Sequence, residues 1–285
     1  MKTDKNFMTA NIKGKLMDFS SPKVMGILNI TPDSFFQGSR KQTEKETAER
    51  VQQMISEGAD IIDVGGYSSR PNAAFVSEQE ELERLRFGLK ILFKEAPNAI
   101  VSIDTFRANI AKVCVEDYGA AIVNDISAGG LDDKMFDTIA ALQVPYIIMH
   151  MRGTPQSMME QTQYNHLMKD IFLYFAEKIN ILHQKGVNDI WIDPGFGFSK
   201  TTDQNYEVLN KLEQFRIFEL PILVGFSRKT MIRDVIQVSA DEALTGTTAL
   251  NMFSLTQGAD ILRVHDVKDA VQTVQLFNKI KKASE

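Results

Sequence analysis

Short apolar runs rich in valine and isoleucine alternate along the chain with longer segments in which apolar positions recur every three or four residues. Most positions in each run are apolar, without a regular alternation with polar positions, which is typical of strands buried on both faces of a parallel sheet. The pattern predicts eight such strands, at residues 24–30, 61–64, 100–103, 121–123, 146–149, 190–192, 222–224 and 261–264.

The segments between the runs have helical periodicity. Clear examples are residues 43–57, 78–95, 106–118, 132–142 and 165–185. Several of the predicted helices run into a glycine before the next strand, and these glycines are Gly58, Gly119, Gly186 and Gly258. A glycine just past a helix end readily adopts the left-handed conformation that terminates the helix.

Eight strand–helix units without a break in composition predict an α/β fold, a single (β/α)₈ or TIM barrel domain over residues 1–285. The length of 285 residues alone would also allow two domains. Residues 1–20 precede the first strand, and within them residues 7–19 are expected to form a short hairpin. We expect this hairpin to close the N-terminal end, or bottom, of the barrel.

Composition and charge exclude several classes of protein. Hydrophobic residues make up 44% and charged residues 24% of the chain, an ordinary globular balance. The formal net charge of −5 gives no long-range attraction to nucleic acid or to an anionic membrane. The single cysteine, Cys114, excludes a disulfide framework and fits a reducing compartment. We therefore expect a cytoplasmic protein whose partners include neither nucleic acid nor membrane.

Polar residues stand where the apolar runs end. In a parallel barrel the active site lies at the C-terminal ends of the strands. Any one of these residues could be a strand-end cap, but several follow strings in which a buried polar group must find a partner. They are Asn29, Asp63, Asp104, Asn124, His150, Asp193, Ser227 and His265.

The short acceptor-bearing side chains of Asp104, Asn124 and Asp193 suit the flat donor–acceptor edge of a heterocycle. His150 has two open interpretations, because it is either a ligand contact or a histidine whose hydrogen bonds are satisfied within the mouth of the barrel.

Four basic residues predict a local anion site in an otherwise acidic protein. Arg263 and His265 lie two apart on the eighth run and therefore point the same way. Lys229 and Arg70 could join them, as binding of an anion requires. The alternatives are a surface ion pair for Arg263 and a solvated loop charge for Lys229.

The sequence contains no His-Glu-x-x-His pattern, no carboxylate-rich cage, no Walker phosphate loop and no glycine-rich dinucleotide fingerprint. A magnesium ion that accompanies a phosphate ligand would need only one or two protein oxygens. The side-chain oxygen of Asn29 is the candidate for this role.

Seven motifs, in order along residues 20–280, closely resemble those of the dihydropteroate synthase family. They are MGILNITPDSF at 25–35, DIIDVGGYSSRP at 60–71, SIDT at 102–105, NDIS at 124–127, DPGFGF at 193–198, GFSRK at 225–229 and RVHD at 263–266. The resemblance implies a transferase of folate biosynthesis that condenses 6-hydroxymethyl-7,8-dihydropterin diphosphate with 4-aminobenzoate. It also implies a homodimer and a sulfonamide target.

The resemblance carries roles to individual positions. The pterin contacts would be Asp104, Asn124, Met149, Asp193 and Lys229, with Met149 as an apolar floor. The diphosphate contacts would be Asn29, Arg70, Arg263 and His265, with Asn29 also binding Mg²⁺. The aminobenzoate pocket would be lined by Phe35, Ser69, Pro71 and Phe198, and the catalytic residues would be Asp33, Arg70 and Lys229.

The chain departs from the family pattern in two loops. Tyr67 stands where many members have glutamate, Asn72 where many have glycine, and Phe36-Gln37 replaces a smaller pair. These differences put loop geometry and the affinity for aminobenzoate and sulfonamides in question.

Three other functions remain open from the residues. One is a pterin-binding barrel that transfers a methyl group from a methylated folate to a corrinoid protein. Another is a non-catalytic pterin-binding paralogue, and the third is a barrel enzyme acting on an unrelated phosphorylated substrate. The first would not need the basic cluster of Arg70, Lys229, Arg263 and His265, and the second should lose the diphosphate residues, which are present here.

Overall fold

A computed structural model describes residues 8–30, 40–68 and 75–283 of the chain. Its centre is a parallel sheet of eight strands in the order β8-β7-β6-β5-β4-β3-β10-β9. A single parallel bridge between Ile192 and Ile222 joins the two ends of this sheet into a barrel. The predicted (β/α)₈ fold is confirmed. The strands are β3 (Lys23–Asn29), β4 (Ile61–Gly65), β5 (Val101–Asp104), β6 (Ile122–Asp125), β7 (Tyr146–Met149), β8 (Ile190–Asp193), β9 (Leu223–Val224) and β10 (Ile261–Val264).

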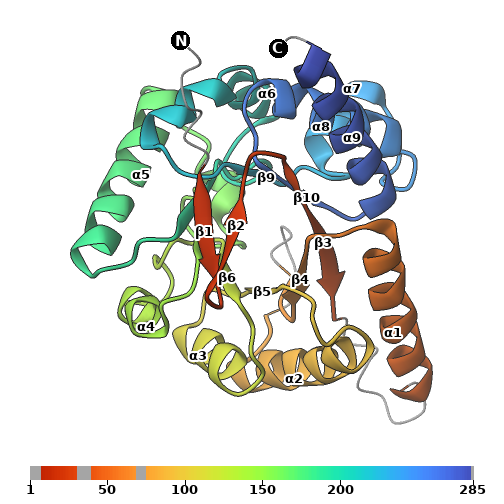
Figure 1. Cartoon of the computed structure of the whole chain (residues 1–285). Coiled ribbons are helices and arrows are strands. Elements are labelled where there is room, and N and C mark those ends of the chain that lie inside the picture. The colour runs from red at the N-terminus through yellow and green to blue at the C-terminus, as the bar shows by residue number, and fades with distance from the viewer. Residues whose placement is uncertain (1–7, 31–39, 69–74, 284–285) are drawn as a thin grey trace, which may run out of the picture.

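Helices surround the barrel, and the last helix lies beside the first (Figure 1). The α-helices are α1 (Arg40–Glu57), α2 (Glu78–Glu95), α3 (Ala108–Glu116), α4 (Met135–Leu142), α5 (Leu167–Gln184), α6 (Thr202–Asn210), α7 (Thr230–Ile236), α8 (Leu244–Thr256) and α9 (Val267–Ala283). Two 3₁₀ segments, η2 (Met158–Glu160) and η3 (Leu212–Phe218), complete the described helical structure.

Local sequence signals account for the ends of several elements. The four glycines predicted to terminate helices all have a positive φ, between 74° and 95°. Helix α2 begins after Ser77, whose side chain accepts a hydrogen bond from the backbone N–H of Glu80. Helix α6 begins with a capping box formed by Thr201 and Gln204.

Helices α3 and α4 begin two and three residues later than predicted, and Asp132 accounts for much of this. Its carboxylate accepts hydrogen bonds from the backbone N–H groups of Ala108 and Lys134, at 2.8 and 3.0 Å. Residues 106–107 and 132–134 therefore precede the first turns of α3 and α4 and are not part of the helices.

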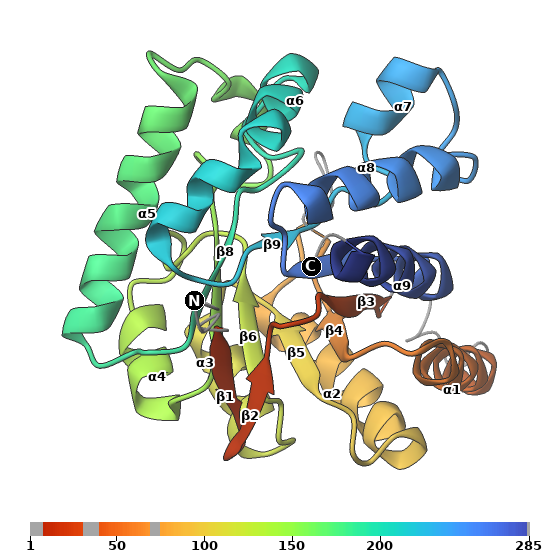
Figure 2. The same cartoon turned by 45° about the horizontal axis from the view of Figure 1, so that its top comes forward.

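The N-terminal hairpin closes the bottom of the barrel, as predicted. Its antiparallel strands β1 (Thr9–Ile12) and β2 (Lys15–Asp18) lie across the ring of strands (Figure 1). The ring of Phe19 meets Trp191 edge to face, with centroids 5.4 Å apart. Figure 2 shows the same hairpin beneath the strands from another angle. Its apolar residues form one buried cluster with Met25, Ile61, Ala121, Ile122, Ile147, Trp191, Leu223 and Ile261 of the barrel.

The inward-facing side chains change character along each strand. Because side chains alternate between the two faces of a strand, positions two apart share the barrel interior. On β4 the inward residue Ile61 is followed by Asp63, on β8 Trp191 by Asp193, and on β10 Ile261 by Arg263. The barrel is therefore apolar at its bottom and charged at its C-terminal mouth.

None of the helices in the described ranges is long and apolar enough to span a membrane.

Candidate active site at the barrel mouth

Two carboxylates share one guanidinium in the mouth. Arg263 donates from Nε to Asp63 Oδ2 at 2.7 Å and from Nη2 to Asp104 Oδ2 at 2.6 Å. The side chains of Asp63, Asp104 and Arg263 are 0%, 14% and 17% exposed. Arg263 therefore forms an ion pair inside the site, and the surface ion pair considered from the sequence is wrong.

Burial raises the pKa of Asp104 to about 7, although the adjacent Arg263 opposes this shift. Burial alone would lower the pKa of Arg263, but the carboxylates of Asp63 and Asp104 raise it above its ordinary value. The guanidinium therefore stays charged, and Asp104 is the member of the cluster whose charge changes near neutral pH.

Asn124 lies beside this cluster and is oriented by it. Its Nδ2 donates to Asp63 Oδ2 at 3.1 Å, and the side chain is buried. Because an ionised carboxylate only accepts hydrogen bonds, Asn124 must turn its NH₂ group toward Asp63. Its carbonyl oxygen then remains as an acceptor for a ligand.

Asp193 is the last residue of β8, and Lys229 follows β9 at the start of α7. Asp193 Oδ1 accepts from the N–H of Gly195 at 2.8 Å, and burial raises the pKa of Asp193. Lys229 Nζ donates to the carbonyl oxygen of Phe196 at 2.6 Å and lies 4.6 Å from the ring centroid of Phe198. Lys229 is thus part of the site, not a solvated loop charge.

Burial lowers the pKa of Lys229 to about 8, and the charge of Asp193 opposes this shift. The ammonium of Lys229 is therefore only moderately favoured at neutral pH.

An apolar cluster adjoins the charged one. Met149 at the end of β7 packs with Phe198, and both are buried. Phe106 and Leu131 pack against the same cluster, whose other members are Ile126, Met151 and Met158. Such a surface can contact the face of a planar ring while the polar groups meet its edge.

His265 is fixed by the loop that follows β9. The Oγ of Ser227 lies 3.1 Å from His265 Nδ1 and accepts from the backbone N–H of His265 at 3.3 Å. Next to them, Arg228 makes two hydrogen bonds with Asp266, at 2.9 and 2.7 Å. This paired contact ties the β9 and β10 loops together.

Asn29 stands at the end of β3, exposed and paired in register with Gly65 of β4. A Cβ atom at Gly65 would lie 3.3 Å from Asn29 Oδ1, so glycine leaves room for this amide. Within the described residues, no group of three histidine, cysteine, aspartate or glutamate side chains could hold a metal ion.

Five of the predicted site residues lie outside the described residues: Asp33, Phe35, Ser69, Arg70 and Pro71. The family departures at Phe36, Gln37 and Asn72 also lie outside them. Tyr67 is described, and its ring meets Phe106 edge to face at 5.2 Å. Its hydroxyl accepts from Gln156 Nε2 at 3.0 Å, so Tyr67 joins the loops after β4, β5 and β7.

Sequence reasoning gave no role to two residues that the structure places at or beside the site. Asp63 ends an apolar run, and that position was its only signal. Lys200 follows the segment DPGFGFS and carried no signal of its own, yet it is 1% exposed and its Nζ lies 3.0 Å from His150 Nδ1. His150 therefore has its hydrogen-bonding partner within the protein.

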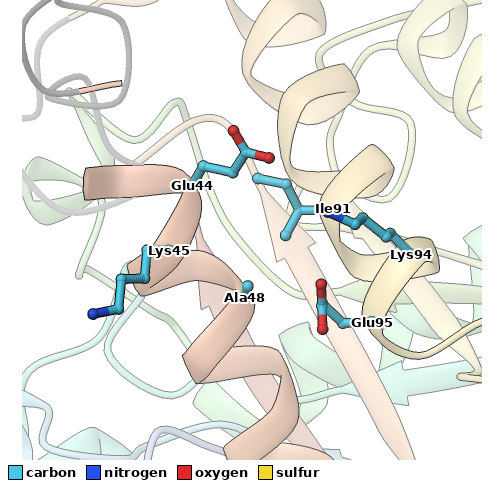
Figure 3. A pocket seen from close by; sticks show the side chains of 6 residues that line it. All are labelled: Glu44, Lys45, Ala48, Ile91, Lys94 and Glu95. Carbon is cyan, nitrogen blue, oxygen red and sulfur yellow. The ribbon is translucent and has the colours of Figure 1, made fainter. Parts of the chain in front are cut away.

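A hollow of about 250 Å³ lies elsewhere, between α1 and α2 on the outer ring (Figure 3). Its lining mixes both charges with two apolar residues and includes no candidate site residue. The lining residues are Glu44, Lys45, Ala48, Ile91, Lys94 and Glu95.

Comparison with known proteins shows what the chain is similar to. Residues 25–265 match the family described as pterin binding enzyme. The chain is 38% identical over 275 residues to the dihydropteroate synthase of Escherichia coli, covering 96% of each protein. It is 40% identical to a folate synthesis bifunctional protein of Arabidopsis thaliana, but spans only 57% of that protein's length.

Two solved structures have the same fold. A Yersinia pestis dihydropteroate synthase in a sulfonamide drug complex has a TM-score of 0.88 and 36% identity, with 97% of this chain and 100% of that chain covered. A Xanthomonas albilineans dihydropteroate synthase with 4-aminobenzoic acid has a TM-score of 0.87 and 30% identity, with coverage of 96% and 98%.

Proposed function

The chain belongs to the pterin-binding enzyme family, within its dihydropteroate synthases, and we propose on that premise how its barrel mouth performs the reaction. It is a transferase that condenses 6-hydroxymethyl-7,8-dihydropterin diphosphate with 4-aminobenzoate to 7,8-dihydropteroate and diphosphate. The observation that carries the assignment of roles is that these groups share one neighbourhood. Asp104 pairs with Arg263, Asn124 donates to the Asp63 that pairs with the same arginine, and the charges of Asp193, Lys229 and Arg263 act on one another. Met149 lies beside Asp193 in the register of β7 and β8.

The pterin binds by its edge. The carboxylates of Asp104 and Asp193 accept N–H groups of the pyrimidine ring, and Asn124 supplies a carbonyl acceptor whose orientation is fixed by Asp63. Lys229 donates to a ring acceptor, and Met149 contacts the face of the ring. Because these groups are buried, a ligand that leaves them unpaired is strongly disfavoured.

The diphosphate binds beside the basic side chains at the end of β10. Arg263 and His265 are the described cationic or donor groups at the end of β10, and Arg70 joins them in this proposal. Charge develops on the leaving diphosphate as the C–O bond breaks, so fixed donors lower the barrier to that step. Arg263 is held in place by Asp63 and Asp104 before substrate arrives.

The chemical step needs little acid or base. The CH₂–O bond breaks with its electron pair leaving on diphosphate, and the electron-rich dihydropterin spreads the positive charge on carbon. The neutral aniline nitrogen forms the new C–N bond and then loses its proton to diphosphate or water. The protein contributes mainly by positioning, which can account for roughly 7–11 kcal/mol of barrier lowering.

Magnesium fits this site as a companion of the diphosphate. The exposed amide oxygen of Asn29 is a suitable ligand for a hard cation that takes its other ligands from phosphate and water. When bound, the ion would help to neutralise the leaving group.

The remaining assignments rest on the family resemblance. Phe35, Ser69 and Pro71 join Phe198 around 4-aminobenzoate, and Asp33 acts with Arg70 from the loops after β3 and β4. These loops exclude water, which would otherwise capture the carbocation. A cytoplasmic location and a homodimer also remain predictions.

The test is diphosphate release on mixing the protein with dihydropterin diphosphate and Mg²⁺, with and without 4-aminobenzoate. We expect release that depends on aminobenzoate and yields dihydropteroate. Tight pterin binding without such release would contradict the proposal and favour a binding-only paralogue. Methyl transfer from a methylated folate to a corrinoid protein would favour the methyltransferase alternative.

A further inference from the structure

Lys200 is a buried cation whose partners are all uncharged. Its side chain is 1% exposed, and its Nζ lies 3.0 Å from His150 Nδ1, 3.0 Å from the Gly195 carbonyl oxygen and 3.1 Å from that of Phe198. Burial lowers the pKa of Lys200 to about 7, and the charge of Asp193 opposes this shift. An ammonium group has three N–H donors, so these three acceptors satisfy it completely. A charge buried in this way is costly unless such a set of partners is held in place.

The contact with Lys200 also bears on the state of His150. When Lys200 is protonated, Nδ1 of His150 is the acceptor, and the imidazole is then neutral with its proton on Nε2. Burial, and then the nearby charges of Lys200 and Arg152, lower the pKa of His150 well below its ordinary value, which agrees with that state. The pair is therefore a donor and a matched acceptor, and His150 has no charge to contribute to catalysis.

The chain wraps tightly around the ammonium. Gly195, Gly197 and Ser199 all have φ values between 50° and 80°, in the left-handed region. A Cβ atom at Gly195 would lie 2.1 Å from the carbonyl oxygen of His150, so only glycine fits there. Ser199 Oγ accepts from the backbone N–H of Arg152 at 2.8 Å and donates to the Arg152 carbonyl oxygen at 2.9 Å.

The same loop supplies contacts to the active site. The Phe196 carbonyl oxygen accepts from Lys229 Nζ at 2.6 Å, and the Phe198 ring lies 4.6 Å from that nitrogen. Glycine and phenylalanine alternate in this loop, from Gly195 to Phe198. The two phenylalanine rings are therefore its only bulky side chains between residues 195 and 198. Lys200 holds the carbonyl oxygens at both ends of this short segment.

We propose that Lys200 is a positioning residue for the second substrate: its ammonium, with His150, fixes the loop at residues 195–199 in the shape that places the Phe198 ring against 4-aminobenzoate. The inference rests on the proposed function.

The pterin contacts Asp104 and Asn124 come from β5 and β6, away from this loop, which follows β8. The loop also touches two pterin contacts, because the Gly195 N–H donates to Asp193 and the Phe196 carbonyl oxygen accepts from Lys229. Loss of Lys200 should therefore weaken aminobenzoate binding more than pterin binding.

The experiment compares K200M with the control K185M, which removes a surface lysine that pairs with Asp137. We would measure the dissociation constant of dihydropterin diphosphate with Mg²⁺ by calorimetry and the Michaelis constant for aminobenzoate by steady-state kinetics. K200M should raise the aminobenzoate KM at least tenfold and raise the pterin dissociation constant by a clearly smaller factor. K185M should change neither constant.

His150 provides a second test if K200M does not fold. H150F removes one of the three acceptors and should raise the aminobenzoate KM severalfold, whereas H150N keeps an acceptor near the Nδ1 position and should restore it. Equal losses of affinity for both substrates, or no change in either, would overturn the role of Lys200. Failure of the wild-type protein to release diphosphate with aminobenzoate would instead overturn the proposed function.

Discussion

The two ends of this barrel use the same strands for opposite purposes. At the bottom, Trp191 and Ile261 face an apolar cluster that the N-terminal hairpin covers. Two residues further along the same strands, Asp193 and Arg263 face the mouth. The backbone geometry is shared, so the difference lies entirely in which side chains are presented to water and ligand.

The comparison shows how stability and chemistry are kept apart. Apolar burial at the bottom stabilises the fold by an amount that grows with the area removed from water. The mouth instead holds carboxylates whose pKa values are raised by burial, such as Asp104 and Asp193, and this costs stability. Substitutions at the mouth should therefore lower catalytic activity, whereas substitutions at the bottom should lower the free energy of unfolding.

The largest expected effect is at the mouth. K229A removes the ammonium that lies against the Phe196 carbonyl and Phe198 ring, and should lower kcat/KM at least ten-thousandfold, about 5.4 kcal/mol in the barrier. Steady-state kinetics would check this, and the midpoint of urea unfolding should stay nearly unchanged. Near-normal activity would remove Lys229 from the site.

At the bottom, W191A should reverse the pattern. Truncating this fully buried side chain leaves a cavity and should cost about 3–5 kcal/mol of unfolding free energy. The rate per folded molecule should be retained. W191F is the matched control: in the described part of the chain the Trp191 Nε1 has no hydrogen-bond partner, so phenylalanine loses packing alone and should cost clearly less. A lower rate per folded molecule with an unchanged free energy of unfolding would contradict the separation of stability at the bottom from chemistry at the mouth.

The pH profile sharpens the comparison at the mouth. The pKa of Lys229 is lowered to about 8, so its proton is lost as the pH rises through that value. The kcat/KM for the pterin substrate, which reports the free enzyme, should then fall about tenfold per pH unit above that value. In K229R, residual activity should show no such fall, because a guanidinium keeps its proton. An unchanged alkaline limb in K229R would assign the fall to another group.

The smallest effect is expected in the hairpin. I12V removes one methyl group from the buried side of β1 and should cost about 0.5–1.5 kcal/mol of unfolding free energy. Thermal unfolding would measure it. L16A, at a side chain that is 75% exposed, should change stability by less than about 0.5 kcal/mol and serves as the control. Equal effects would mean that the hairpin does not pack on the barrel through this face.

The strands and the hairpin could be predicted because their signals are local. Continuous apolar runs and helix-ending glycines act over a few residues, and each predicted strand was found. Asp63 and Lys200 could not be assigned, since their meaning depends on distant partners. Asp63 binds Asn124 and Arg263, which are 61 and 200 residues away, and Lys200 binds His150, which is 50 residues away.

The weakest join of the barrel lies beside the site. Strand β9 has only two residues and meets β8 through the single bridge from Ile192 to Ile222. Asp193 stands on one side of this seam and Lys229 on the other. A pterin bound by both residues would link β8 to the loop after β9, where the barrel has few hydrogen bonds of its own. Substrate binding should therefore raise the free energy of unfolding of the barrel.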